Sequence, residues 1–117
     1  DGDRAVVDGY KEIGGLARKG KRAILLGDWE ELGLLMNRNH EIQQTLGASG
    51  KANDEFIELA LANGALGAKL AGAGGGGTII ALHHEPQKLI EAFSAKGNPR
   101  VLALDPGPGL TVKGDVS

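Results

Sequence analysis

Residues 70–80 read LAGAGGGGTII, in which five glycines stand between two apolar runs. Ordering a glycine costs roughly 0.5–1 kcal/mol more than ordering an alanine, so this segment is costly to hold in one conformation. A flexible tether would not need apolar strands at both ends, whereas a loop whose backbone approaches a ligand needs this composition. The stretch therefore predicts two strands joined by a loop that contacts a ligand.

The residues on either side of the loop support this interpretation. ALGAKLAG (65–72) is short and mostly apolar, and TIIALHH (78–84) is rich in β-branched and aliphatic residues, so both are predicted to be strands. The elements predicted after them are a helix from Pro86 to Lys96 and two strands over residues 100–105 and 110–114.

Three helices are predicted before the loop. The first covers residues 5–26 and is expected to be kinked or interrupted, because three glycines weaken its middle: Gly14, Gly15 and Gly20. Asp28 is the predicted cap of the second helix, with Glu31 completing a capping-box pattern. Asn53 is the predicted cap of the third helix, which ends at residues 63–64.

The predicted order is three helices, two strands, one helix and two strands. Helices gathered before a small sheet predict a two-layer α+β fold in which the sheet is antiparallel. With 117 residues and 12.1 kDa, the chain forms one predicted domain over residues 1–117. It begins with Asp1, so we expect it to be a processed or truncated piece of a longer chain.

Composition excludes several classes of function. The formal net charge is −2, so no excess of positive charge favours nucleic acid or an anionic membrane as a partner. The chain lacks cysteine, which rules out disulfides and thiolate metal sites and fits a reducing compartment. There is no long apolar run and no basic-apolar targeting segment at the start. We therefore expect a soluble cytoplasmic protein.

The glycine loop matches two nucleotide motifs only incompletely. Gly72, Gly74 and Gly77 satisfy the dinucleotide fingerprint G-x-G-x-x-G, but a strand follows where that motif needs a helix. A P-loop fails because Thr78 stands where its phosphate-binding lysine must be. Successive glycine N–H groups can instead form a concave anion-binding nest, for which phosphate is a common ligand. A plain glycine-rich hairpin without a ligand stays as the alternative.

Two longer segments resemble one protein family. GALGAKLAGAGGGGTIIAL (64–82) is similar to the third signature motif of the GHMP small-molecule kinases, and GDWEELGLLMNRNHEIQQTLGAS (27–49) resembles the helical segment before that motif. The resemblance extends over residues 5–112 and is nearest to mevalonate kinases, followed by the sugar and heptose kinase branch. Two departures are Ala71, where many members carry Ser or Thr, and Thr78, which replaces a frequent cysteine.

The resemblance implies that this chain is the C-terminal, ferredoxin-like half of a two-domain ATP-dependent kinase. The acceptor would be a hydroxyl of a mevalonate-like molecule or a sugar. ATP and Mg²⁺ would be bound mainly by the N-terminal domain of the same chain, since the ATP loop of the family has no counterpart here. The resemblance places no catalytic residue in this segment, which is expected to be inactive alone. A homodimer stays open.

The candidate site residues follow from the loop and its neighbours. The predicted phosphate-loop and active-site support consists of Gly72, Ala73, Gly74, Gly75, Gly76 and Gly77. Lys69 leads into the loop and is a candidate cation for phosphate, with a solvent-facing strand lysine as the alternative. Asn37 and His40 share a helix face that borders the substrate cleft in the family, with exposed polar residues as the alternative.

Other residues are predicted to be structural. His83 and His84 point to opposite faces of a strand, so they are not expected to bind one metal ion together. Trp29 is predicted to pack at the start of its helix. Two functional hypotheses follow: the C-terminal half of a small-molecule kinase, or a non-catalytic anion-binding or regulatory α+β module. A preceding domain with the family's ATP loop would favour the first.

Overall fold

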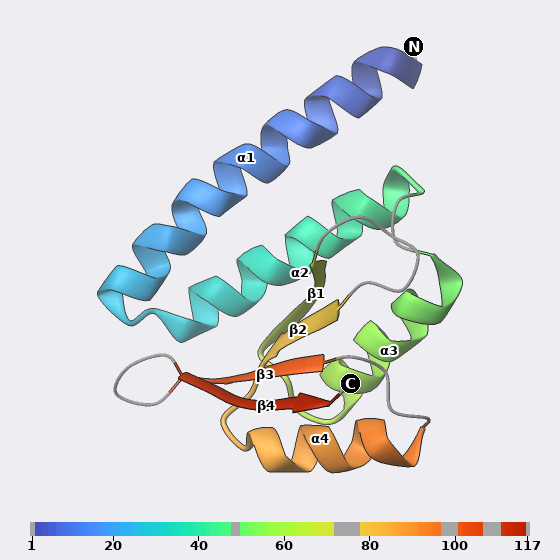
Figure 1. The fold of residues 1–117 in the computed structure, drawn as a ribbon. Coiled ribbons are helices and arrows are strands. Elements are labelled where there is room, and N and C mark those ends of the chain that lie inside the picture. Colours follow the sequence, from blue (N-terminus) through green and yellow to red (C-terminus); the bar gives the residue numbers. More distant parts are fainter. Residues whose placement is uncertain (1, 48–49, 72–77, 97–100, 107–110, 117) are drawn as a thin grey trace.

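The computed structural model describes residues 2–47, 50–71, 78–96, 101–106 and 111–116 (Figure 1). The elements are α1 (Gly2–Leu26), α2 (Trp29–Thr45), α3 (Lys51–Ala62), β1 (Gly67–Ala71), β2 (Thr78–Leu82), α4 (Pro86–Ala95), β3 (Val101–Asp105) and β4 (Thr111–Val116). Their order confirms the predicted succession of helices and strands, and with it the α+β class.

The four strands form one sheet in the order β1-β2-β3-β4. β1 pairs with β2 and β3 pairs with β4 in antiparallel fashion, as expected, but β2 and β3 run parallel. The prediction of a wholly antiparallel sheet is therefore wrong. The reason is α4, which connects β2 to β3 and returns the chain to the end of the sheet at which β2 began, so that both strands run in the same direction.

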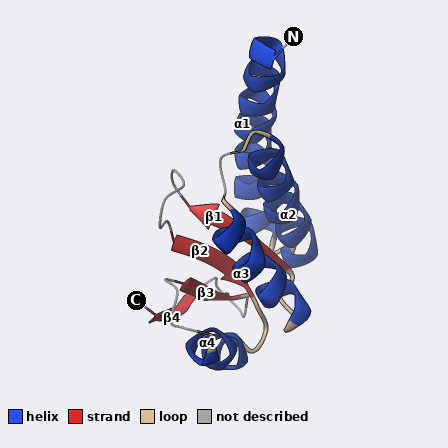
Figure 2. Cartoon of the chain, turned by 90° about the vertical axis from the view of Figure 1, so that its right-hand side faces the viewer, coloured by secondary structure: helices blue, strands red, loops and turns tan. Residues whose placement is uncertain are grey.

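Helices cover both faces of the sheet, so the fold has one layer more than the predicted two (Figure 2). Ile79 and Ala81 of β2 belong to a core with α3 and α4, whereas Ile80 and Leu82 pack in a second core with α1 and α2. Neighbouring residues of a strand point to opposite faces, which explains how one short strand supplies both cores.

α1 is one uninterrupted helix of 25 residues, so the predicted interruption at its glycines is wrong. Packing against α2 outweighs the low helix propensity of glycine: Gly20 is buried, and a Cβ there would lie 3.6 Å from the Leu32 side chain. Arg38 of α2 also binds Glu12 of α1 through two nitrogens, at 2.6 and 3.0 Å, and lowers the pKa of that carboxyl. Among the described helices, none is long and apolar enough to cross a membrane.

Two helix boundaries test the predicted caps. The Asp28 carboxylate accepts a hydrogen bond from the Glu31 N–H at 3.2 Å, which confirms the predicted start of α2. At α3 the prediction is wrong, because the helix starts at Lys51 after Gly50, and Asn53 lies inside its first turn. The end of α3 is as predicted, since Asn63 is its C-cap and Gly64 follows with a positive φ.

α2 approaches β1 through a pair of glycines that the sequence pattern did not reveal. A Cβ on Gly33 would lie 2.7 Å from the carbonyl carbon of Leu66, and one on Gly67 would lie 2.6 Å from the Cα of Gly33. Any side chain at either position would force the helix away from the strand. The contact therefore sets the distance between α2 and the edge strand of the sheet.

Candidate functional site

The glycine segment over residues 72–77, which carries the predicted phosphate-loop residues, lies outside the described residues. The structure describes the strands at its ends. β1 and β2 pair from Gly67↔Leu82 to Ala71↔Thr78, so the segment connects two backbones that are held side by side at their last pair. The predicted strand-loop-strand arrangement is confirmed at both ends of the segment.

Asn37 bridges α2 and the edge strand. Its Oδ1 accepts a hydrogen bond from the Ala68 N–H at 3.1 Å, and its Nδ2 donates to the Leu66 carbonyl at 3.4 Å. These two backbone groups face away from β2 at the edge of the sheet, where no further strand pairs with them. The Asn37 amide thus substitutes for a neighbouring strand and fixes α2 to β1.

His40 lies one turn further along α2, and only 4% of its surface is exposed. Its Nε2 is 2.9 Å from Oδ1 of Asp54 on α3, close enough for an ion pair, although the approach is not that of a well-aligned hydrogen bond. Its Nδ1 is buried and has no hydrogen-bond partner among the described residues. His40 therefore joins α2 to α3 through one nitrogen and leaves the other available.

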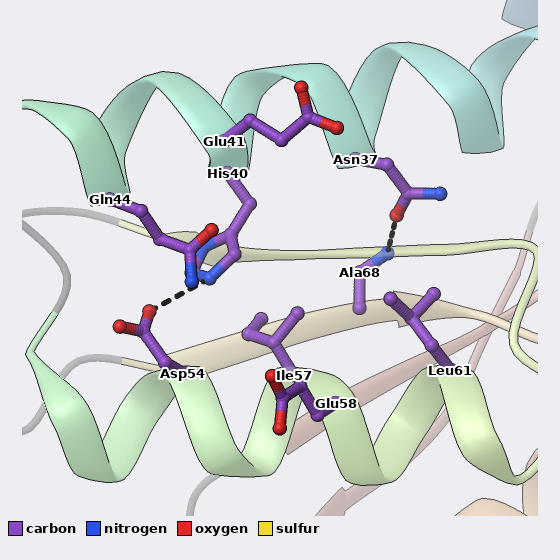
Figure 3. A pocket seen from close by; sticks show the side chains of 9 residues that line it. All are labelled: Asn37, His40, Glu41, Gln44, Asp54, Ile57, Glu58, Leu61 and Ala68. Carbon is purple, nitrogen blue, oxygen red and sulfur yellow. Dashed lines mark hydrogen bonds and ion pairs between the residues drawn. The ribbon is translucent and has the colours of Figure 1, made fainter.

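Asn37 and His40 line a groove between α2 and α3 that lies over the edge of β1, and we call it the edge groove (Figure 3). Its volume is about 210 Å³, and its lining residues are Asn37, His40, Glu41, Gln44, Asp54, Ile57, Glu58, Leu61 and Ala68. The lining holds three carboxylates and neither lysine nor arginine. The electrostatics of the edge groove thus favour hydroxyl or cationic groups over a phosphate or a carboxylate.

Lys69 points to the other face of the sheet. It pairs in register with Ile80, which packs on α1 and α2, while its neighbours Ala68 and Leu70 belong to the core with α3 and α4. The lysine is half-buried, and burial lowers the pKa of its ammonium group. The surroundings of Lys69 are thus partly apolar, and the predicted alternative of a solvent-facing strand lysine stays open.

Lys69 lines a second groove, which we call the face groove, between α1, α2 and the sheet. Its volume is about 320 Å³, and its lining residues are Leu16, Ala17, Gly20, Lys21, Ile24, Leu32, Leu35, Met36, Asn39 and Lys69. The three predicted substrate contacts are consequently divided between two grooves, with Asn37 and His40 in one and Lys69 in the other.

Sequence reasoning missed Asn39, which is 6% exposed and whose Oδ1 is buried without a hydrogen-bond partner among the described residues. The spacing of apolar residues in the sequence could have indicated that Asn39 is buried. Asn39 falls three residues after Met36 and three before Ile42, so it is a polar residue in the buried stripe of α2. A polar side chain in an apolar helical stripe indicates either a buried hydrogen bond or a ligand contact.

The two adjacent histidines lie in different surroundings. Nδ1 of His83 accepts a hydrogen bond from the Glu85 N–H at 2.7 Å, so Nε2 carries the proton and donates to the Asn63 carbonyl at 2.6 Å. Both ring nitrogens are thus occupied, and His84 is exposed. No group of three or more metal-ligating side chains occurs within the described part of the chain. Trp29 is confirmed as a packing residue at the start of α2.

Comparison with known proteins identifies the family. A family profile described as "GHMP kinases C terminal" matches residues 21–99. The chain is 47% identical over 108 residues to the mevalonate kinase of Thermococcus gammatolerans, and this alignment covers 86% of this chain and 32% of that protein. It is 40% identical over 106 residues to the mevalonate kinase of Pyrococcus furiosus, and this alignment covers 85% of this chain and 32% of that protein.

A solved structure supports the fold. The crystal structure of L. major mevalonate kinase in complex with R-mevalonate superposes with a TM-score of 0.61 and 22% identity, over 96% of this chain and 37% of that one. The chain spans about a third of the length of the curated relatives it matches. The family match includes the edge groove, most of the face groove and the paired strands β1 and β2. The chain therefore belongs to the GHMP kinases, as a C-terminal domain related to those of mevalonate kinases.

Proposed function

We propose that residues 1–117 form the C-terminal domain of an ATP-dependent kinase that transfers the γ-phosphoryl group to a hydroxyl of a mevalonate-like acceptor. The observation that carries this proposal is the pairing of β1 and β2 up to Ala71↔Thr78 in a chain that matches the GHMP kinases. The relatives named above are mevalonate kinases, which favours a mevalonate-like acceptor over a sugar.

The proposed role of the chain in the reaction is to position and stabilise charge. Phosphoryl transfer needs the phosphoryl group and the acceptor hydroxyl in line, with developing charge neutralised by N–H groups and cations. Residues 72–77 would supply or brace backbone N–H groups for this purpose. ATP with Mg²⁺ would supply the phosphoryl group and part of the neutralising charge. The resemblance to the family would place the Mg²⁺ ligands mainly in the N-terminal domain.

Within the edge groove, His40 is the better candidate for an acceptor contact. Its buried Nδ1 has no partner among the described residues, so it can bond to a hydroxyl group. The Asn37 amide already bonds to the backbone of β1, and an acceptor would have to share it. Three carboxylates line the groove, so the groove suits a neutral part of the acceptor. Lys69 lies in the other groove, where an anionic group would be favoured.

The proposal also requires an N-terminal domain of the same chain as a partner. Several large apolar side chains are exposed along α1: Val6, Val7, Tyr10, Ile24, Leu25 and Leu26. A long helix with exposed apolar residues at both ends is typical of a surface that another domain covers. We therefore propose that the N-terminal domain packs along α1.

Replacement of Gly75 by Val in the full-length polypeptide that carries this domain tests the proposed role of the loop. A β-branched side chain would obstruct close approach of the backbone to phosphate, so we expect turnover of ATP with mevalonate to be abolished while the melting temperature changes little. Gly14→Ala is the matched control, because a Cβ there meets nothing within 4 Å. Near-normal turnover in Gly75→Val would contradict the proposal, and a parallel assay with sugars would identify the acceptor class.

A further inference from the structure

The face groove contains a half-buried cation without a counter-ion. Lys69 makes no hydrogen bond or ion pair with any described residue, and burial lowers the pKa of its ammonium group. Removing an ammonium group from water costs free energy unless an anion or hydrogen-bond acceptors replace the lost water. Lys69 keeps part of its contact with water, but in the described part of the chain no anion or acceptor offsets the rest of this cost.

Asn39 lines the same groove, and its Oδ1 is a buried acceptor without a donor among the described residues. Asn39 is 94% buried, since 6% of its surface is exposed. An unpaired buried carbonyl oxygen costs roughly 1–3 kcal/mol. A ligand group that offers an O–H or N–H at this position would remove that cost.

The rest of the groove lining fits a small organic molecule. The only ionisable side chains that line it are Lys69 and the exposed Lys21 of α1, so the described lining carries positive charge alone. Leu16, Leu32 and Met36 provide apolar walls. The edge groove, on the other side of α2, has the opposite character, with three carboxylates and no basic side chain. The face groove is thus distinguished by its charge as well as by its unpaired polar atoms.

We propose that the face groove binds a small organic anion that also carries a hydroxyl group. Its carboxylate or phosphate would bind the Lys69 ammonium, its hydroxyl would donate to Asn39 Oδ1, and its hydrocarbon part would contact the apolar walls. The site is built entirely from α1, α2 and β1. Its ligand is held by residues outside the segment 72–77, so it can be tested apart from the proposed role of that segment.

Binding of three probes to the full-length polypeptide, in the absence of nucleotide, tests the proposal. The probes are β-hydroxybutyrate, butyrate and inorganic phosphate, with affinities measured by NMR titration or calorimetry. We expect β-hydroxybutyrate to bind more tightly than butyrate, because only the former has a donor for Asn39, and to bind more weakly as salt rises. If inorganic phosphate binds as tightly as β-hydroxybutyrate, the hydrocarbon part and the hydroxyl group of the ligand contribute nothing, and the proposal of an organic ligand is wrong.

Three substitutions assign the binding to this groove. Lys69→Met should lower the affinity for β-hydroxybutyrate by about tenfold or more, because a charge-assisted hydrogen bond is lost. Asn39→Leu should remove the preference for β-hydroxybutyrate over butyrate while leaving butyrate binding similar. Lys51→Met, on an exposed position of α3, is the matched control and should change neither affinity. Unchanged binding in Lys69→Met would overturn the proposal.

A measurement on the unsubstituted protein does not depend on the folding of any variant. The acylation rates of individual lysines are compared by mass spectrometry with and without β-hydroxybutyrate. We expect the ligand to slow acylation of Lys69 and to leave that of the exposed Lys51 on α3 unchanged. If Lys69 is unreactive without ligand and insensitive to it, another part of the polypeptide fills the groove, and the proposal is wrong.

Discussion

The two grooves on either side of α2 use their polar residues in opposite ways. In the edge groove the Asn37 amide bonds to the backbone of β1, and His40 contacts Asp54 on α3, so polar side chains connect elements of the fold. In the face groove Lys69 and the Oδ1 of Asn39 have no partner among the described residues. The two asparagines of α2 show the difference most directly: Asn37 is bonded to the backbone at the sheet edge, whereas Asn39 Oδ1 has no partner among the described residues.

The largest expected effect comes from breaking the α2–β1 contact that both grooves share. In Gly67→Ala the new Cβ would overlap the backbone oxygen of Gly33 and lie 2.6 Å from its Cα. We expect a loss on the order of 3 kcal/mol in the free energy of unfolding, because backbone atoms on both sides must move. Chemical denaturation measures this loss. Gly14→Ala, with open space around its Cβ, should instead be neutral or slightly stabilising, and equal losses in both variants would refute the contact.

A substitution in each groove sharpens the comparison directly. Asn37→Leu leaves the Ala68 N–H and the Leu66 carbonyl without their hydrogen-bond partner, so we expect it to lower the free energy of unfolding by about 2 kcal/mol. Asn39→Leu removes a buried oxygen that has no partner, and we expect it to be neutral or stabilising. Urea denaturation of the two variants compares them. A larger loss in Asn39→Leu than in Asn37→Leu would contradict the assignment of the two amides.

The smallest effect is expected at Lys69, and its sign is the informative part. Lys69→Met removes a half-buried charge that has no counter-ion among the described residues. We therefore expect the free energy of unfolding at neutral pH to increase by on the order of 0.5 kcal/mol, with a corresponding rise in melting temperature. The same variant should lose binding of β-hydroxybutyrate. A fall in melting temperature would indicate that the ammonium group has a stabilising partner.

The pH dependence of this difference follows from the lowered pKa of Lys69. The folded state releases the lysine proton at a lower pH than the unfolded state, whose lysine keeps its ordinary pKa near 10.5. Between these two values the unfolded state binds more protons, so the stability of the unsubstituted protein rises with pH. The advantage of Lys69→Met should therefore shrink as pH increases toward 10.5, because the buried charge disappears. Lys21 also lines this groove from α1, so Lys21→Met serves as the background for this measurement.

Local signals in the sequence predicted the elements of this fold well. Hydrophobic period, the Asp28 cap and the proline at the start of α4 depend on neighbours within a few residues, so they can be found without a structure. The predicted cap at Asn53 failed because the chain ends its turn at Gly50, where a positive φ suits glycine and the helix begins one residue later. The prediction of an antiparallel sheet also failed at β2 and β3, which pair in parallel, since strand direction depends on where α4 returns the chain.

The site was predicted only in part, for the same reason. The resemblance of residues 27–49 and 64–82 to the GHMP kinases needed only the order of residues, and the family match confirms it. The sequence could not show that Asn37 would bond to the edge of β1 or that Lys69 and Asn39 would share a groove, because these residues are about 30 positions apart. Such contacts depend on the distance between α2 and β1, which is set by Gly33 meeting Gly67.

The sequence by itself thus determined the order of helices and strands, the glycine segment between two paired strands, and membership of the kinase family. Each of these depends on short-range patterns of polarity and backbone preference along the chain. The tertiary structure alone decided which polar side chains are satisfied by the fold and which are left without a partner. That outcome depends on how closely α2 packs against the sheet and α1 against α2, and packing distance is a property of two surfaces together.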